Sequence, residues 1–407
     1  MRIAKSTIAL GLALLAGPAL AQLGLPMASL PALPPVGGVL DAPLRAGSDL
    51  LRGTASEVAE TLQAARLERI GTLLRRNRGT IERDAAGEPA RSGELLLVDP
   101  GPATLAAVGA LGFAAAESGT LGELGMSYAR LRLPAGLSLA AAQRLLAERV
   151  PAAVVASDQL HFQSGRGAAT SGTGAIGAAP AIGVAVGVID GAAVQPVAGT
   201  RGFAKGAPLA SNHGSAVVAL AQRAGVRRLF VADVYGSDPA GGNALAIAQG
   251  LGWLVGEGAR VVSISLVGPR NPLVERAIAA AQRRGVTVVA AVGNDGPAAP
   301  PAYPASYPGV LAVTAVDARN RPLIEAGRAL HLDYAAPGAD LRAANKKGKR
   351  VEVRGTSFAA PLVAARAAAA LERGGGVTAA LDREAQPLGR RLPDPQIGRG
   401  LVCGTCR

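Results

Sequence analysis

The chain has 407 residues, of which 49% are hydrophobic and only 3% are aromatic. This length and apolar content suffice for a large hydrophobic core and a smaller domain, and they exclude a mostly disordered protein. The formal net charge of +13 raises the question of an anionic partner.

The N-terminus has the parts of a secretory signal peptide. Basic residues precede an apolar run over 8–16, and a small-x-small pattern ends at Ala21. The apolar run is too short to span a bilayer, and the absence of a cysteine after Ala21 argues against a lipid anchor. We therefore expect residues 1–21 to be cleaved off a secreted or periplasmic protein that has no stable membrane insertion.

The next stretch indicates a linker, a helix and a small domain. Residues 22–92 are expected to be a linker with one amphipathic helix, because apolar side chains recur at helical spacing between 55 and 76. Residues 93–163 show the order β-α-β-β-α-β, which predicts a ferredoxin-like α+β domain. Glycine and small residues over 164–181 predict an exposed, cleavable linker.

Residues 182–402 have a different sequence pattern, in which short apolar runs alternate with alanine-rich helical segments. Strands without polar alternation, separated by helices, predict a doubly wound, mostly parallel sheet with helices on both faces. In such sheets functional side chains gather at the carboxyl ends of the strands. The predicted strands are the runs IGVAVGVID, RRLFVADVY, ARVVSISLV, VTVVAAVGN and GVLAVTAVD.

Polar residues lie at the ends of these strands and at the starts of the helices. Asp190 and Asn294 follow strands, whereas His213 and Ser357 begin helices. Each has an ordinary interpretation, as a strand-end carboxylate, a turn residue, an exposed helix-start residue or an N-cap. Together they supply a serine, a base, an orienting carboxylate and an amide donor, which is the machinery of acyl transfer.

The segments around these residues resemble the subtilisin-like serine proteases, or subtilases. VGVID resembles the aspartate motif of that family, NHGSAVVALA its histidine segment, AAVGNDGP its oxyanion region and GTSFAAPLVA its serine signature. The order Asp, His, Ser is also that of the family. The resemblance covers residues 182–402, and residues 93–162 resemble a subtilase propeptide, which assists folding and occupies the substrate cleft until it is removed.

The resemblance implies a role for each motif. Ser357 would be the nucleophile and His213 its general base, with Asp190 orienting the imidazole. Asn294, together with the Ser357 N–H, would hold the oxyanion. A separate hypothesis, which does not come from the resemblance, is that Asp295 beside Asn294 tolerates or favours a basic residue before the scissile bond. Other residues would bind the main chain of the substrate or line the specificity pocket, namely Ser265, Leu266, Val267, Gly268, Ala291, Val292 and Gly293.

Some positions depart from the family pattern. Asp190 is followed by Gly-Ala instead of Ser/Thr-Gly, and Val267 stands where a glycine usually lines the specificity pocket. The short spacing between Asp190 and His213 leaves little room for calcium-binding loops. Because no reacting atom is lost, we expect an active, self-processing serine endopeptidase. The alternative is a catalytically inactive subtilase-fold protein that binds or inhibits.

The remaining features predict few partners beyond substrate. Positive charge is densest over 346–350, but aromatic residues are scarce, which favours a solvated face over a nucleic-acid site. Cys403 and Cys406, in the tail 403–407, predict a local disulfide or two exposed thiols. No cofactor is required and no metal site is identified, although calcium is compatible with the resemblance. We expect a monomer that binds protein or peptide substrates and its own propeptide, as intramolecular chaperone and inhibitor.

Overall fold

The computed structural model describes residues 55–168, 179–389 and 392–406. The chain divides into two compact units, Met1–Leu33 and Pro34–Arg407, and every described residue belongs to the second. The predicted signal peptide and most of the predicted linker over 164–181 lie outside the described residues. Within the described ranges, no helix is both long enough and apolar enough to cross a membrane.

The first described element is the helix α2, Ala55–Arg76, which has the bounds expected from the apolar spacing. Its buried side chains, Val58, Leu62, Ile70 and Leu73, recur every three to four residues or at multiples of that spacing. These side chains form the apolar stripe by which α2 packs on the rest of the unit.

The N-terminal subdomain, residues 81–159, is an antiparallel sheet with two helices. The sheet order is β1-β2-β4-β3, with β5 paired to β2 on the side away from β4. From β2 onward the chain order is the expected β-α-β-β-α-β. Its elements are β1 Ile81–Arg83, β2 Pro89–Val98, α3 Pro102–Ala110, β3 Ala114–Thr120, η3 Gly122–Leu124, β4 Ser127–Arg132, α4 Leu139–Arg149 and β5 Val155–Gln159.

This subdomain begins earlier than the predicted boundary at residue 93. β1 pairs with the first half of β2 across a tight turn, whose backbone N–H groups at Ala86 and Glu88 donate to the carboxylate of Asp84. The charged, turn-rich composition of this stretch concealed the strand pair, because β1 has only three residues and the first half of β2 is only partly apolar.

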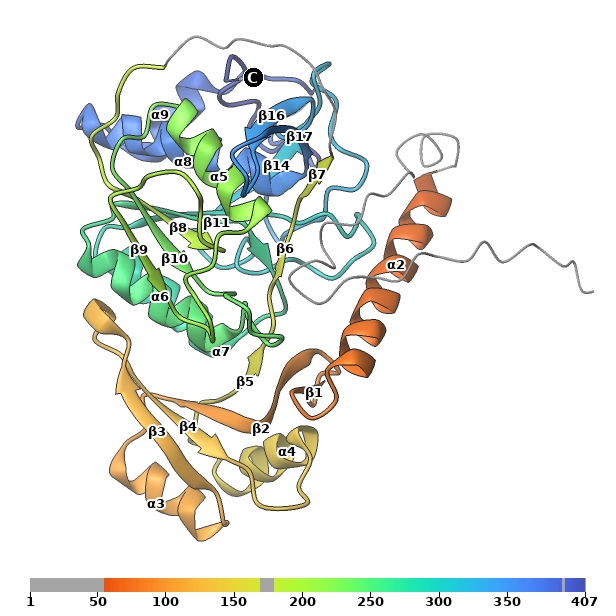
Figure 1. The fold of residues 1–407 in the computed structure, drawn as a ribbon, viewed down its shortest axis with the longest axis vertical. Helices are drawn as coiled ribbons and strands as arrows, with labels where there is room; N and C mark the ends of the chain where they lie inside the picture. The colour runs from red at the N-terminus through yellow and green to blue at the C-terminus, as the bar shows by residue number, and fades with distance from the viewer. Residues whose placement is uncertain (1–54, 169–178, 390–391, 407) are drawn as a thin grey trace, which may run out of the picture. The chain divides into compact units, whose positions relative to one another are not determined.

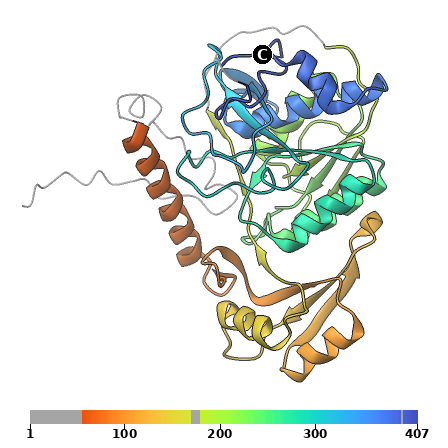
Figure 2. The same cartoon turned by 180° about the vertical axis from the view of Figure 1, so that it is seen from behind.

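The N-terminal sheet has helices on both of its faces. Leu95 and Leu97 of β2 pack with α3 and α4, whereas Leu96 and Val98 point into the core of the C-terminal subdomain. Figures 1 and 2 show α3 and α4 on the side of this sheet that lies away from helices α6, Ala244–Gly256, and α7, Pro272–Arg283.

The C-terminal subdomain, residues 182–402, contains a sheet of seven parallel strands in the order β15-β14-β13-β11-β8-β10-β9. The predicted doubly wound sheet is therefore confirmed. The apolar runs did not reveal β9, because this edge strand has no apolar side chain. The strands are β8 Val186–Asp190, β9 Gly199–Gly202, β10 Leu229–Asp233, β11 Val261–Ile264, β13 Thr287–Ala291, β14 Leu311–Val316 and β15 Tyr334–Pro337.

Helices cover both faces of this sheet and enclose two large apolar clusters (Figure 1). One face packs against α5, Asn212–Arg223, and the alanine-rich α8, Thr356–Glu372, while α6 and α7 cover the other. The short helix α9, Val377–Glu384, packs on α8. Small alanine side chains allow α8 to lie against the centre of the sheet, where nearly all of its residues are buried.

The segment that joins the two subdomains, residues 160–168, is called the connecting segment below. Its strand β6, Phe162–Gln163, pairs antiparallel with β12, Leu266–Val267. Its strand β7, Arg166–Ala168, pairs antiparallel with β17, Arg350–Arg354. The prediction of an exposed linker from residue 164 is wrong for its first residues, because backbone pairing across the C-terminal subdomain holds them in place (Figure 1).

The basic stretch 346–350 and the cysteine pair were the remaining predicted features. Residues 346–350 are exposed, with 346–349 in the turn after β16, Leu341–Ala344, and Arg350 at the start of β17. Cys403 and Cys406 form a disulfide with each other, which is the first of the two states expected from the sequence.

Candidate active site

The buried pair of Asp190 and His213 lies at the middle of the parallel sheet. Asp190 ends β8, between β10 and β11, where the winding of the sheet changes direction. His213 is at the start of α5, whose N-cap Ser211 accepts a hydrogen bond from the N–H of Gly214. The His213 Nδ1 lies 2.8 Å from Asp190 Oδ2. This contact leaves Nε2 as the ring atom able to accept a proton.

The Nε2 atom of His213 is buried and has no hydrogen-bond partner among the described residues. Gly165 of the connecting segment lies beside it, since a Cβ built on Gly165 would be 3.1 Å from Nε2. The imidazole therefore faces the peptide that follows Ser164.

Ser357 is fully buried in the first turn of α8. The chain enters this helix through Gly355 at φ 142°, where a Cβ would lie 2.7 Å from Asn294 Nδ2, so only glycine fits. The Ser357 Oγ is hydrogen-bonded to the Ser265 carbonyl at 3.0 Å and to the Ser164 Oγ at 2.7 Å. Its hydrogen bonds therefore go to these two groups and not to His213.

Asn294 follows β13 and is held by the start of α8. Its Oδ1 accepts the N–H of Thr356 at 3.1 Å, and the Thr356 hydroxyl accepts the N–H of Gly293 at 3.0 Å. The Nδ2 of Asn294 donates to the carbonyl oxygen of Ser164. The backbone N–H of Ser357 donates to the same oxygen at 3.1 Å. Two donors thus converge on one peptide carbonyl.

The connecting segment is bound in an extended conformation on both sides of that carbonyl. Gln163 pairs with Leu266 and Phe162 with Val267 in the β6–β12 ladder, and the N–H of Ser164 donates to the Ser265 carbonyl at 3.4 Å. β7 continues the extended chain beyond Gly165. A peptide in this position presents one main-chain carbonyl to Ser357, Asn294 and His213 together.

The predicted pocket-wall residues lie next to this segment. Ala291 ends β13 and Val292 follows it, and both are buried. A Cβ on Gly293 would be 3.1 Å from a Val267 methyl group, so Val267 fills the space beside Gly293. The position of Gly268 differs, because a Cβ there would lie 2.5 Å from the His161 ring.

Within the described residues, the ion pairs of Asp295 are made with α2. Its carboxylate binds Arg69 of α2 at 2.8 Å and Arg66 at 3.5 Å. The prediction that Asp295 favours a basic residue before the scissile bond therefore finds no support in this geometry. The spacing of the motifs could not reveal the partners, since Arg69 and Asp295 are 226 residues apart.

Sequence reasoning missed two side chains of the connecting segment, His161 and Gln163. The Gln163 Nε2 donates to Asp190 Oδ1 at 2.9 Å. The His161 ring is fully buried, and in the described part of the chain neither ring nitrogen has a hydrogen-bond partner. This burial lowers the pKa of His161 to about 4. A signal was available, because both residues directly precede the predicted cleavable linker.

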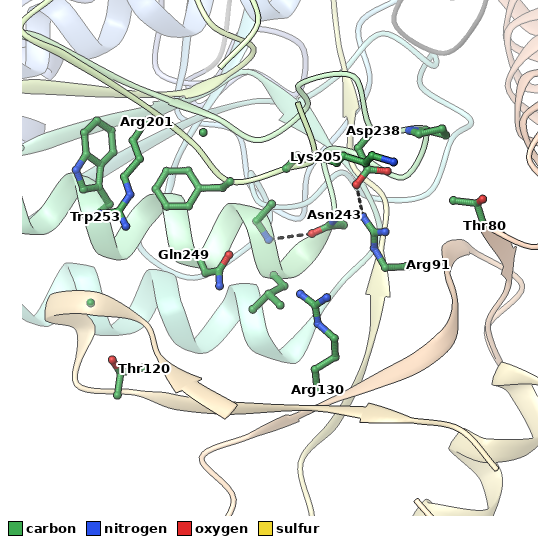
Figure 3. Close-up of a pocket in the computed structure, with 17 residues that line it drawn as sticks. Thr80, Arg91, Thr120, Arg130, Arg201, Lys205, Asp238, Asn243, Gln249 and Trp253 are labelled. Carbon is green, nitrogen blue, oxygen red and sulfur yellow. Dashed lines mark hydrogen bonds and ion pairs between the residues drawn. The ribbon is translucent and has the colours of Figure 1, made fainter. Parts of the chain in front are cut away.

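A cavity of about 920 Å³ lies between the two subdomains (Figure 3). Its charged lining includes Arg91 and Arg130 from the N-terminal sheet and Lys205 and Asp238 from the other side. Arg91 binds Asp238 at 2.5 Å across it. None of the predicted catalytic residues lines the cavity, so it belongs to the interface between the subdomains.

A metal centre was not predicted. In the described part of the chain, no group of three or more His, Cys, Asp and Glu side chains is arranged to hold a metal ion.

The sequence profile described as the subtilase family matches residues 163–382. Subtilisin BL of Lederbergia lenta is 35% identical over 204 residues, which are 46% of this chain and 75% of that protein. Subtilisin Savinase of the same organism is 34% identical over 204 residues, with the same shares covered.

A solved structure shares the fold over a longer part of the chain. Fervidolysin from Fervidobacterium pennivorans, described as a keratinolytic enzyme related to subtilisin, superposes with a TM-score of 0.64 at 16% identity. The match covers 78% of this chain and 61% of that chain.

Proposed function

The chain belongs to the subtilase family and is a subtilisin-like serine endopeptidase, and from this premise we propose how it works. Ser357 is the nucleophile, His213 the general base and Asp190 the carboxylate that orients the imidazole and stabilises its charged form. Asn294 Nδ2 and the Ser357 N–H form the oxyanion hole. This assignment is supported by the 2.8 Å contact between His213 and Asp190 and by the buried position of all three side chains.

One observation carries the proposal further: both oxyanion donors point at the Ser164 carbonyl oxygen. We propose that the first substrate is the precursor itself and that the bond cleaved is Ser164–Gly165. The position of Gly165 beside His213 Nε2 supports this, since the leaving amine must receive a proton there.

The proposed reaction has two halves. The Ser357 side chain rotates from the Ser265 carbonyl toward Nε2, gives its proton to His213 and bonds to the Ser164 carbonyl carbon. The negative oxygen of the tetrahedral intermediate stays in the oxyanion hole. The bond to Gly165 then breaks, His213 gives its proton to the new amine, and Ser164 remains as an ester on Ser357. Water, deprotonated by His213, hydrolyses that ester and regenerates the serine.

The residues up to Ser164 are proposed to act as a propeptide, both chaperone and inhibitor. After cleavage they stay docked by side-chain contacts at the helix starts of the C-terminal subdomain. Asn271, the N-cap of α7, donates to the carbonyl of Ser157 at 2.9 Å. Asp158 accepts the N–H of Leu245 in the first turn of α6 at 2.9 Å. Such contacts favour formation of α6 and α7, while β6 and Ser164 occupy the substrate site.

The remaining parts of the proposal follow from the sequence. Residues 1–21 direct export and are removed, giving a secreted or periplasmic enzyme that acts on proteins or peptides as a monomer without a required cofactor. Finding residues 1–21 still attached to protein recovered from the cell envelope or medium would contradict the export step.

A fluorophosphonate probe tests the catalytic assignment directly. The processed enzyme should be labelled on Ser357, and Ser357→Ala should abolish labelling. Ser237→Ala, a change at an exposed serine outside the triad, is the matched control and should label normally. A correctly processed enzyme that takes no label would support the alternative, an inactive subtilase-fold binding or inhibitory protein.

A further inference from the structure

One carboxylate oxygen of Asp190 accepts a hydrogen bond from a side chain of the connecting segment. Asp190 is fully buried, and its Oδ2 binds His213. Its Oδ1 accepts the N–H of Gly191 at 2.7 Å and the Nε2 of Gln163 at 2.9 Å. A side chain of the connecting segment therefore supplies one of the hydrogen bonds of the buried carboxylate.

The residue after Asp190 leaves this edge of the carboxylate open. Gly191 has no side chain, and a Cβ there would be 2.5 Å from Ser211 Oγ and 3.6 Å from Gln163 Nε2. Any larger residue at position 191 would grow into the space between the helix cap and the glutamine. The absence of a side chain thus admits the Gln163 carboxamide to Asp190.

We propose that the subsite for the residue preceding Ser164 selects a glutamine side chain, because its carboxamide donates to the Oδ1 of Asp190. This inference rests on the proposed function, in which Ser164–Gly165 is the cleaved bond. Gln163 is then the second residue before that bond, and the preference extends to other protein substrates with glutamine at the same place.

The subsite should bind glutamine, leucine, asparagine and glutamate side chains with different strength, although the four are of related size. Leucine fills the space but leaves Oδ1 with one hydrogen bond fewer. Asparagine carries the same amide on a chain one methylene shorter, so that the amide falls short of Asp190. Glutamate places a second negative charge beside a buried carboxylate, which is the least favourable arrangement. A hydrogen bond to a charged acceptor is stronger than one between neutral groups.

A peptide panel tests the inference without altering the enzyme. The processed wild-type enzyme is given peptides with the sequence of residues 159–168, in which the residue at the position of Gln163 is Gln, Leu, Asn or Glu. A fifth peptide exchanges Phe162 and Gln163 and so keeps the composition. We expect kcat/KM to fall about tenfold for Leu, Asn and the exchanged peptide and about a hundredfold for Glu.

The same four residues at position 163 of the full-length precursor should give the same order of self-cleavage rates. Equal rates for Gln and Leu in both assays would overturn the inference and leave the endopeptidase proposal intact. Glutamate cleaved as fast as glutamine would also overturn it. If no peptide and no precursor is cut between Ser and Gly, both the cleavage-site proposal and this inference are wrong.

Discussion

The carbonyl oxygen of Ser164 accepts a 3.1 Å hydrogen bond from the backbone N–H of Ser357, although the two residues are 193 positions apart in the sequence. The Asn294 Nδ2 donates to the same oxygen. Donors that are already in place stabilise the charge of the tetrahedral intermediate without reorganising during the reaction. The connecting segment is thus held as a substrate would be.

Asn294→Ala removes one of these two donors. We expect kcat for peptide hydrolysis to fall ~10²–10³-fold, the cost of removing one such donor in subtilisin. KM should change little, because the substrate peptide can still pair with β12 as β6 does in the precursor. Steady-state kinetics on one peptide measures both constants. An unchanged kcat would show that Asn294 does not hold the oxyanion.

Gly165→Ala places a methyl group against the ring of Phe358. A Cβ at this position would be 2.6 Å from Phe358 Cε2, closer than carbon atoms approach without strain, so self-cleavage should become much slower. Phe358→Leu in the same chain makes room and should restore part of the rate. The disappearance of intact precursor on a gel measures both rates. Wild-type speed in the single Gly165→Ala variant would contradict the position of Gly165.

Asp295→Asn breaks the ion pairs that hold α2. The side chains of Arg66, Arg69 and Asp295 are 18–23% exposed, and a pair of this kind contributes on the order of 1 kcal/mol. We expect faster hydrogen exchange of the α2 amides in the Ser357→Ala precursor, and the difference from wild type should shrink at high salt.

Arg75→Gln is the matched control for that experiment, because Arg75 lies on the same helix and its side chain donates to the hydroxyl of Thr72, one turn away, and not to Asp295. Its α2 amides should exchange as in wild type. Equal effects of the two changes would mean that helix propensity, and not the contact with Asp295, governs α2.

His161 should make the docked state sensitive to acid. Burial lowers the pKa of its ring to about 4 from the ordinary 6.5, so the released segment binds a proton in this range while the docked one does not. Docking should therefore weaken as the pH falls from about 6.5 to about 4 and change no further from this cause below it. Unfolding of the Ser357→Ala precursor by denaturant at several pH values measures the slope.

His161→Leu tests the origin of that slope. Leucine does not titrate, so the part of the pH dependence due to residue 161 should vanish between pH 4 and 6.5. The same slope in the leucine variant and in the parent would mean that other groups cause the acid sensitivity.

The sequence predicted the features that follow from local patterns. The apolar runs indicated the parallel strands, and the helical spacing placed α2 at 55–76. Asp190 and Asn294 lie at or just after strand ends and His213 and Ser357 at helix starts, as the sequence patterns predicted. The edge strand β9 was missed, since its residues Gly199–Gly202 carry no apolar signal.

Contacts between segments that are distant in the chain could not be predicted from the sequence. Small residues from 164 onward have the composition of a linker, but Ser164 is hydrogen-bonded to Asn294 and Ser357, and β7 pairs with β17. The placement of Asp295 against Arg66 and Arg69, and of Gln163 against Asp190, depends on how separate elements pack. No spacing rule encodes these pairs.

N-terminal sequencing of the large fragment released by purified precursor is the most direct test of the account. We predict that the fragment begins at Gly165 and that Ser357→Ala precursor, incubated alone under the same conditions, stays intact. A fragment that begins elsewhere, or the same fragment from Ser357→Ala precursor without added protease, would contradict cleavage of the Ser164–Gly165 bond by Ser357.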